Sequence, residues 1–134
     1  MTKLLYNEKA LVEVTKEFTF DSCHHLLDYV GKCANPHGHT YKLQVTLKGT
    51  LDNIGMVLDF SILKKVVKER IIEKLDHKDL NKELHFNTTA ENMCVWIFDR
   101  LNNDERIIKS KAKVVKVRLW ETPTSFAEYK GEVM

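Results

Sequence analysis

The sequence has little of what marks disordered, secreted or membrane-spanning chains. Its 134 residues include only two prolines and five glycines, and 43% of them are apolar, which is typical of a chain that folds around a core. No apolar run approaches the roughly 18 residues that span a bilayer, and Asn7 and charges interrupt the start of the chain, where a secretory signal needs an apolar core. We therefore expect a single cytoplasmic domain over residues 1–134, with no membrane partner.

Charge and cysteine content argue against a nucleic-acid-binding protein and against a protein stabilised by disulfides. The formal net charge is +2, with 21 basic and 19 acidic residues evenly mixed. This balance predicts no nucleic-acid partner, although a small basic excess suits a phosphorylated small molecule. The three cysteines, Cys23, Cys33 and Cys94, are odd in number and form no CxxC pair. A disulfide framework is therefore not expected, and the interest of these residues lies in thiol chemistry.

Alternating apolar and polar residues predict four strands, and a helical period predicts two helices between the second and third. The strands are expected over residues 11–20, 39–49, 113–120 and 125–130, and the helices over residues 60–75 and 89–101. Asp59 is the expected N-cap of the first helix. Thr88, with Glu91 three residues later, predicts a capping box for the second helix. Residues 76–81 are expected to form a polar loop.

The resulting order is β-β-α-α-β-β, without repeats or low-complexity segments. It fits an α+β fold in which a four-stranded antiparallel sheet carries two amphipathic helices on one face. Such a sheet has free edges that can continue into a neighbouring copy. We therefore expect a homo-oligomer.

Residues 20–41 contain four of the six histidines and two of the three cysteines. His37 and His39 lie two residues apart at the start of the second strand, so they can converge on one metal ion. The third ligand would be His24 or His25. Strand alternation favours His24, because His25 points to the opposite face. Three imidazoles and an open position are typical of catalytic zinc, although such histidines can also be structural or lie in a surface turn.

Four other residues could take part in chemistry near such a metal. Cys33 lies four residues before His37, close enough for a metal cation to lower the pKa of its thiol. Such a thiol could act as a base or a nucleophile. It could equally be a fourth metal ligand or be inert. Asp76 and His77 form an acid–imidazole pair, although adjacent residues seldom bond to one another and this pair is also a common helix stop. Glu121 could accept two hydrogen bonds from the planar edge of a pterin or guanine, or simply be solvated.

Together these residues resemble the 6-pyruvoyltetrahydropterin synthase superfamily over nearly the whole chain. The pattern is Phe20-x-x-x-His24-x-Leu26, Cys33-x-x-x-His37-Gly38-His39, Met56-Val57-x-Asp59-Phe60-x-x-Leu63-Lys64, Leu75-Asp76-His77-x-x-Leu80-Asn81, Thr89-x-Glu91-Asn92 and Glu121-Thr122. The three-residue gap between Cys33 and His37 is similar to the 6-carboxy-5,6,7,8-tetrahydropterin synthase branch, which serves queuosine (7-deazaguanine) biosynthesis. The pyruvoyl branch usually has a longer gap, and a folate-pathway branch has glutamate in place of Cys33.

The resemblance implies a tunnelling fold, with subunits joined edge to edge into trimeric barrels that stack as homohexamers. It also implies that His24, His37 and His39 bind Zn²⁺ and that Cys33 is the catalytic thiol.

The resemblance further implies that Asp76 and His77 complete a proton relay. Glu121 would anchor the pterin, and Thr89 would touch it from a neighbouring subunit. The expected reaction converts 7,8-dihydroneopterin triphosphate to 6-carboxy-5,6,7,8-tetrahydropterin, with release of triphosphate and acetaldehyde. Alternatives are 6-pyruvoyltetrahydropterin formation, without side-chain cleavage, and a non-catalytic zinc-stabilised binding module.

Three positions depart from the pattern. Cys23, where relatives often have alanine, puts a second thiol near the expected metal, and His25 stands where relatives often have arginine. Thr88 replaces a proline that commonly precedes the pterin-contacting threonine. The expected capping box therefore gives Thr89 a structural explanation as well.

Overall fold

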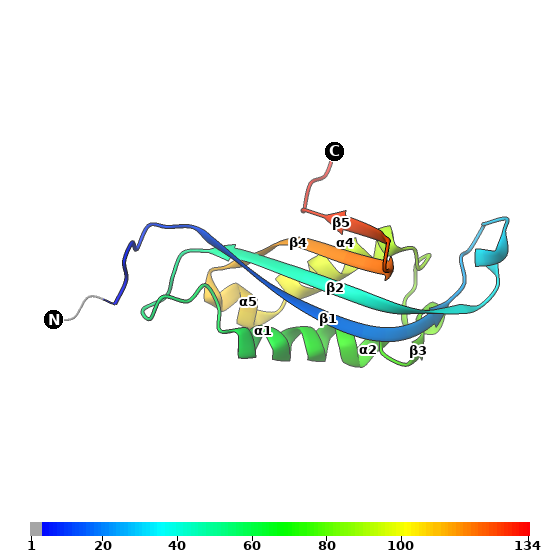
Figure 1. Cartoon of the computed structure of the whole chain (residues 1–134), viewed down its shortest axis with the longest axis horizontal. Coiled ribbons are helices and arrows are strands. Elements are labelled where there is room, and N and C mark those ends of the chain that lie inside the picture. The colour runs from blue at the N-terminus through cyan, green and yellow to red at the C-terminus, as the bar shows by residue number, and fades with distance from the viewer. Residues whose placement is uncertain (1–3) are drawn as a thin grey trace.

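The computed structural model describes residues 4–134, and its centre is a five-stranded sheet in the order β3-β1-β2-β4-β5 (Figure 1). The strands are β1 (Val12–His24), β2 (His37–Gly49), β3 (Lys78–Asp79), β4 (Lys113–Thr122) and β5 (Ser125–Tyr129). The pairs β1–β2, β2–β4 and β4–β5 are antiparallel, whereas β3 runs parallel to β1. The three long strands β1, β2 and β4 and the shorter β5 are the four strands that the sequence predicted.

The expected four-stranded, purely antiparallel sheet is wrong, because β3 makes the sheet mixed and five-stranded. This short strand lies in the segment predicted to be a polar loop. His77 adopts a left-handed backbone conformation with a φ of 56°, and its N–H donates to the Asp21 carbonyl at 2.6 Å. The chain therefore turns back alongside β1 and adds two residues to its edge. A strand of two residues is too short to show a period of two in the sequence.

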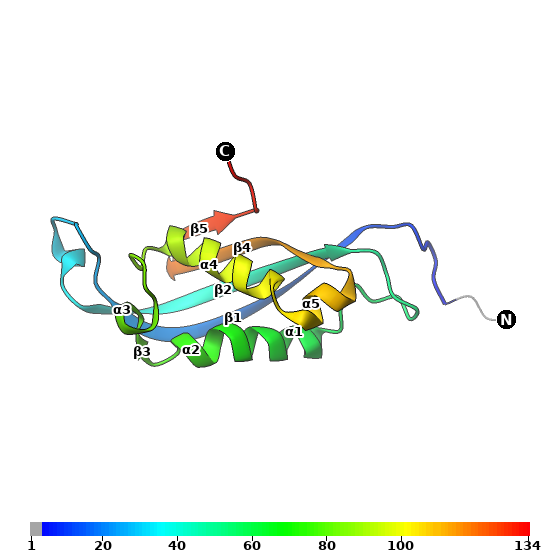
Figure 2. The same cartoon turned by 180° about the vertical axis from the view of Figure 1, so that it is seen from behind.

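The helices lie on one face of the sheet, as predicted, and Figure 2 shows them in front of the strands. They are α1 (Phe60–Val67), α2 (Glu73–Leu75), α3 (Leu80–Glu83), α4 (Ala90–Asn102) and α5 (Glu105–Ser110). A π-helical turn over Lys68–Ile72 joins α1 to α2, so the first predicted helix is continuous in space. The sequence did not predict α3 or α5.

Two helix caps show where local sequence signals succeed and fail. Asp59 caps α1 as predicted, accepting from the Ser61 N–H at 2.8 Å. The prediction of Thr88 as the cap of α4 is wrong: Thr89 is the cap, and its hydroxyl accepts from the Asn92 N–H at 3.1 Å. Thr88 is fully buried and bonds to His24 instead. A tertiary contact thus takes the residue that the local pattern assigned to the cap.

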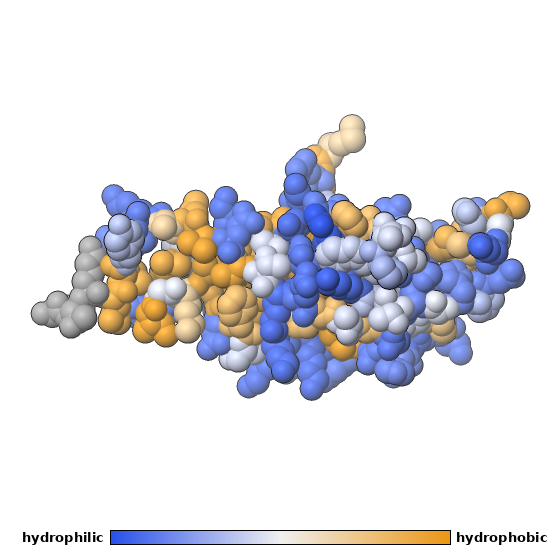
Figure 3. All heavy atoms as spheres, in the orientation of Figure 1, coloured by the Kyte–Doolittle hydropathy of each residue, from blue (hydrophilic) through white to orange (hydrophobic). Residues whose placement is uncertain are grey.

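The core lies between the helices and the covered face of the sheet. Its largest fully buried side chains include Tyr41, Leu43, Leu119, Leu63 and Ile97. The opposite face of the sheet is open, and Figure 3 shows it largely hydrophilic over the strands, with apolar side chains gathering toward the N-terminal end. Within residues 4–134 no helix is both long and apolar enough to cross a membrane.

Candidate metal centre

The pairing of β1 with β2 brings three histidines together. His24 lies opposite His37, and Ser22 lies opposite His39. Directly opposed residues of an antiparallel pair point to the same face, so all three imidazoles lie on the helix-covered face at one end of the sheet. Their rings are 4.6 to 5.2 Å apart between centroids. The structure therefore places His24, rather than His25, with the other two, as the alternation predicted.

Glu121 joins this group from the C-terminal end of β4, which lies beside the start of β2. Its Oε1 is 3.2 Å from His24 Nε2 and 3.4 Å from His39 Nε2. The ligand atoms of His24, His37, His39 and Glu121 all lie within 4.8 Å of one another. The sequence predicts a substrate contact for Glu121 and not a place in this group. The antiparallel order of β2 and β4 is the signal that could have placed it here.

Two backbone carbonyls fix the direction of the imidazoles. His24 Nδ1 is 2.8 Å from the Thr88 carbonyl oxygen, and His37 Nδ1 is 2.8 Å from the Asn35 carbonyl oxygen. Carbonyl oxygens only accept hydrogen bonds, so both Nδ1 atoms carry the proton. In the neutral tautomer, the Nε2 lone pairs then face the centre of the group. A backbone carbonyl on the second nitrogen is the usual support of a metal-binding histidine.

The electrostatics of the group favour a cation at its centre. Within residues 4–134, His24 Nε2 and His39 Nε2 are buried and have no hydrogen-bond partner. Desolvation by burial lowers the pKa of His39, which favours the neutral imidazole. A neutral His24 would direct its Nε2 lone pair at the Glu121 carboxylate. Two hydrogen-bond acceptors would then face one another with no proton between them, which is unfavourable. A divalent cation relieves this conflict without a buried imidazolium, and three nitrogens with one oxygen suit Zn²⁺.

Protonation of His24 is the other way to satisfy Glu121. A protonated His24 would donate from Nε2 to Glu121, and this hydrogen bond would be the main cause of a lowered pKa of the Glu121 carboxyl group. This alternative puts a positive charge beside His39, where burial favours the neutral imidazole. The fit to a metal ion is therefore the better account of the group.

A second cluster lies at the edge of β1, where Asp76 and His77 bond to one another. The distance from His77 Nδ1 to Asp76 Oδ1 is 3.0 Å. Asp76 Oδ1 also accepts from the Asp21 N–H at 2.9 Å. The hydrogen bond from Asp21, together with that from His77, lowers the pKa of Asp76. The adjacent residues can pair because the left-handed turn at His77 directs its ring back to Asp76.

The Asp21 side chain extends this second cluster. Its carboxylate lies within 4.8 Å of the Asp76 and His77 ligand atoms and accepts from the Thr40 hydroxyl at 2.5 Å. A cleft of about 560 Å³ adjoins both clusters, with His39, Thr40 and His77 among its lining residues. Asp21 and His77 of the second cluster border this cleft, whereas His39 is the one member of the histidine group that lines it.

Cys33 and Thr89 lie apart from these clusters. Cys33 is in a 3-10 turn over Lys32–Ala34, in the β1–β2 connection that extends beyond the sheet (Figure 1). It is half-buried, and its thiol is in neither group of mutually close ligand atoms among residues 4–134. Cys23 is exposed, with its thiol 3.7 Å from the Lys78 carbonyl. The Thr89 hydroxyl serves as the α4 cap.

The fold and the site agree with one family. A protein-family model described as "6-pyruvoyl tetrahydropterin synthase" matches residues 13–132. The chain therefore belongs to this family.

Individual relatives carry two names within the family. The chain is 41% identical over 144 aligned positions to "6-carboxy-5,6,7,8-tetrahydropterin synthase" of Haemophilus influenzae, covering 89% of this chain and 99% of the relative. It is 34% identical to "6-pyruvoyl tetrahydrobiopterin synthase" of Dictyostelium discoideum, with 96% and 87% covered. The solved structure of Caenorhabditis elegans 6-pyruvoyl tetrahydropterin synthase has a TM-score of 0.80 and 28% identity, with 94% and 99% covered.

Proposed function

We propose that this protein is a zinc-dependent lyase of the 6-carboxytetrahydropterin type. It would convert 7,8-dihydroneopterin triphosphate and water to 6-carboxy-5,6,7,8-tetrahydropterin, acetaldehyde and triphosphate, in queuosine (7-deazaguanine) biosynthesis. The observation that carries the proposal is the convergence of His24, His37 and His39 with Glu121. The 41% identity to a relative named for the carboxy product supports this branch.

Each residue of the histidine group has a role in this proposal. His24, His37 and His39 hold the metal. A bound Zn²⁺ would polarise the side-chain hydroxyls of the substrate and ease removal of a proton from the neighbouring carbon. Glu121 anchors the planar amidine-like edge of the pterin through its carboxylate. The contact of that carboxylate with His24 and His39 gives it a second possible role, as a fourth ligand, and the zinc content of Glu121→Gln separates the two roles.

The remaining roles concern protons. Cys33, as thiolate, takes a proton from the substrate carbon and returns it. Asp76 stays ionised because its pKa is lowered, and it holds the proton of His77 on Nδ1. His77 Nε2 is then free to exchange a proton with substrate, as in other carboxylate–imidazole pairs.

We propose that the site is completed between subunits. Cys33 is separate from both clusters in one chain, and β5 ends one side of the sheet unpaired. Continuation of such an edge into a second copy is a common route to symmetric oligomers. A barrel of three subunits, doubled to a homohexamer, would bring Thr89 of one copy toward the pterin of its neighbour.

Product analysis tests the reaction. The zinc-loaded protein is incubated with 7,8-dihydroneopterin triphosphate, and the products are identified by mass spectrometry. The proposal predicts the carboxypterin and an equal amount of acetaldehyde. The second candidate, favoured by relatives such as that of Dictyostelium, predicts only the 6-pyruvoyl product, and that result would overturn the branch assignment. No turnover at all, with zinc bound, would favour the non-catalytic zinc module.

A further inference from the structure

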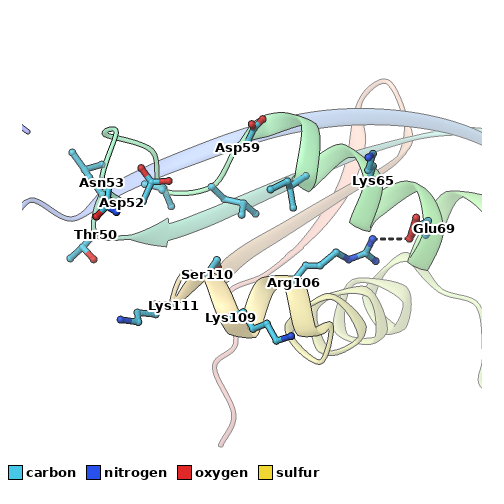
Figure 4. Close-up of a pocket in the computed structure, with 14 residues that line it drawn as sticks. Thr50, Asp52, Asn53, Asp59, Lys65, Glu69, Arg106, Lys109, Ser110 and Lys111 are labelled. Carbon is cyan, nitrogen blue, oxygen red and sulfur yellow. Dashed lines mark hydrogen bonds and ion pairs between the residues drawn. The ribbon is translucent and has the colours of Figure 1, made fainter. Parts of the chain in front are cut away.

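A large cleft lies far from the histidine group, at the opposite end of the sheet. Its volume is about 960 Å³, and it is formed by the loop after β2, the outer side of α1, and α5 (Figure 4). The 13 residues of β2 separate the cleft at Thr50 from His37, a distance of roughly 40 Å at the usual rise of a strand. The volume falls in the usual range of small-molecule sites. A ligand here would not touch the candidate metal centre.

The acidic side chains of the cleft are already engaged within the protein. Asp52 Oδ1 accepts from the backbone N–H groups of Ile54 and Met56 at 3.0 and 2.9 Å. Asp59 caps α1, and the hydrogen bond from the backbone N–H of Ser61 lowers its pKa. These carboxylates hold the loop and the helix start in place.

Glu69 is the third acid, and it pairs with Arg106. The Arg106 Nη1 atom donates to Glu69 Oε2 at 2.7 Å, a contact drawn between α5 and the helix above it in Figure 4. Arg106 also bonds to the buried Asp104 through two of its nitrogens. This network spans the two helices that border the cleft and makes that part of its wall rigid.

Basic side chains, by contrast, remain available on both sides of the cleft. Lys65 lies on α1, and Lys109 and Lys111 lie at the end of α5 or just beyond it (Figure 4). Within residues 4–134 neither Lys65 nor Lys111 makes an ion pair. Lys109 contacts Glu105 at 3.8 Å, but both side chains are more than three-quarters exposed, and such pairs contribute little. Four basic and three acidic side chains line the cleft, so its formal net charge is +1 and its lysines are the charged groups that remain free to meet a ligand.

The cleft also offers an apolar surface between these cations. Leu51, Val57, Leu58 and Ile62 line it. Val57 and Leu58 are buried at 5% and 8% exposure, whereas Ile62 is 38% exposed. An inorganic ion would leave this surface in water, whereas a ring or other apolar body would cover it.

We propose that this cleft binds a phosphorylated small molecule of nucleotide size. The phosphates contact Lys65 on one side and Lys109 and Lys111 on the other, and the ring covers the apolar surface at Ile62. Because the cleft is remote from the histidine group, the site is independent of the proposed lyase reaction.

Calorimetric titration of the full-length protein with ATP tests the proposal, with inorganic triphosphate and adenosine as the two partial ligands. ATP is expected to bind more tightly than either. The double variant Lys65→Ala/Lys111→Ala is expected to weaken ATP binding at least tenfold. The matched control Lys64→Ala/Lys113→Ala, which removes one lysine of α1 and the first lysine of β4, both outside the cleft, is expected to bind ATP as the unmodified protein does.

A third variant separates the apolar part of the site from the charged part. Ile62→Ser is expected to weaken ATP binding while leaving triphosphate binding unchanged. Three results would overturn the proposal: no ATP binding at millimolar concentration, equal binding of ATP by the Lys65/Lys111 variant, or equal affinity for triphosphate and ATP. Product formation from the pterin substrate, measured separately, is unaffected by these outcomes.

Discussion

His24 Nδ1 donates a hydrogen bond to the carbonyl oxygen of Thr88 at 2.8 Å, and the Thr88 hydroxyl lies 3.1 Å from the same nitrogen. The loop before α4 therefore orients an imidazole of β1 that is 64 residues away in the sequence. This contact explains why Thr88 is buried and why α4 begins one residue later than its sequence indicates. It also fixes the His24 tautomer that a metal ion needs.

Substitution of two neighbouring threonines should accordingly distinguish a residue that supports metal binding from one that caps a helix. Thr88→Val keeps the carbonyl but loses the hydroxyl, and we expect zinc affinity to fall by up to about tenfold, the lower end of the effect of such supporting groups. Thr89→Val removes the α4 cap and should cost about 1 kcal/mol of stability while zinc affinity is unchanged. Competition with a zinc-binding dye and urea unfolding measure the two effects. Equal loss of zinc affinity in both variants would contradict this division.

The acid–imidazole pair should matter for turnover and not for metal binding. Asp76→Asn removes the carboxylate that holds the Nδ1 proton of His77, and we expect turnover to fall on the order of 10²-fold or more, as for other general acid–base groups. Zinc content should stay at the level of the unmodified protein. Steady-state rates and metal analysis check the two halves of this prediction. Unchanged turnover in Asp76→Asn would remove the pair from the mechanism.

The thiols of Cys33 and Cys23 should differ in function. Cys33→Ala is expected to retain zinc and the native fold but to lose turnover, because the proposed base is gone. Cys23→Ala is the matched control, since Cys23 is exposed and its thiol contacts the Lys78 carbonyl, and it should keep its rate within about twofold. Turnover of both variants is measured with the same zinc-loaded preparations. A loss confined to Cys23→Ala would assign the reacting thiol to that residue instead.

Asp104 should make the stability of the fold depend on pH. It is 2% exposed, and hydrogen bonds from Arg106, with further help from Arg70, hold its pKa far below the ordinary 3.8. Because its pKa is lower in the folded state, ionised Asp104 stabilises the fold at pH values above its unfolded-state pKa of roughly 4. This stabilisation is lost progressively as the pH falls from there toward the folded-state pKa.

The Asp104→Asn variant isolates this contribution. We expect it to lower the free energy of unfolding by about 2 kcal/mol at pH 7, within the usual range for a lost buried charge contact. The difference from the unmodified protein should shrink as the pH is lowered below about 4, because the Asp104 carboxyl then takes up a proton in the unfolded chain while it stays ionised in the folded one. Urea unfolding at several pH values measures the difference. A difference that is constant from pH 7 to pH 3 would contradict the assignment.

Long-range regularities made most of the sheet predictable from the sequence. Thirteen-residue strands such as β1 show many alternations, so both their positions and the face of His24 follow from the pattern. The segments that the sequence did not reveal are short: β3 has two residues and α5 has six. Two residues show no period and six make fewer than two helical turns, so tertiary contacts decide the structure of these two segments.

The same distinction applies to the site. His37 and His39 are near neighbours in sequence, so their convergence with His24 could be predicted from strand pairing. Glu121 and Thr88 join them only through packing of β4 and of the loop before α4. The place of Cys33 depends on a connection that extends beyond the sheet, and its role stays a prediction.

Zinc bound per chain, measured by inductively coupled plasma mass spectrometry, tests the central claim most directly. The unmodified protein is compared with His37→Ala, and with His25→Ala as the control for an adjacent histidine outside the group. We expect close to one zinc per chain in the unmodified protein and in His25→Ala, and close to none in His37→Ala. Equal zinc content in His37→Ala and the unmodified protein would contradict the metal centre formed by His24, His37 and His39.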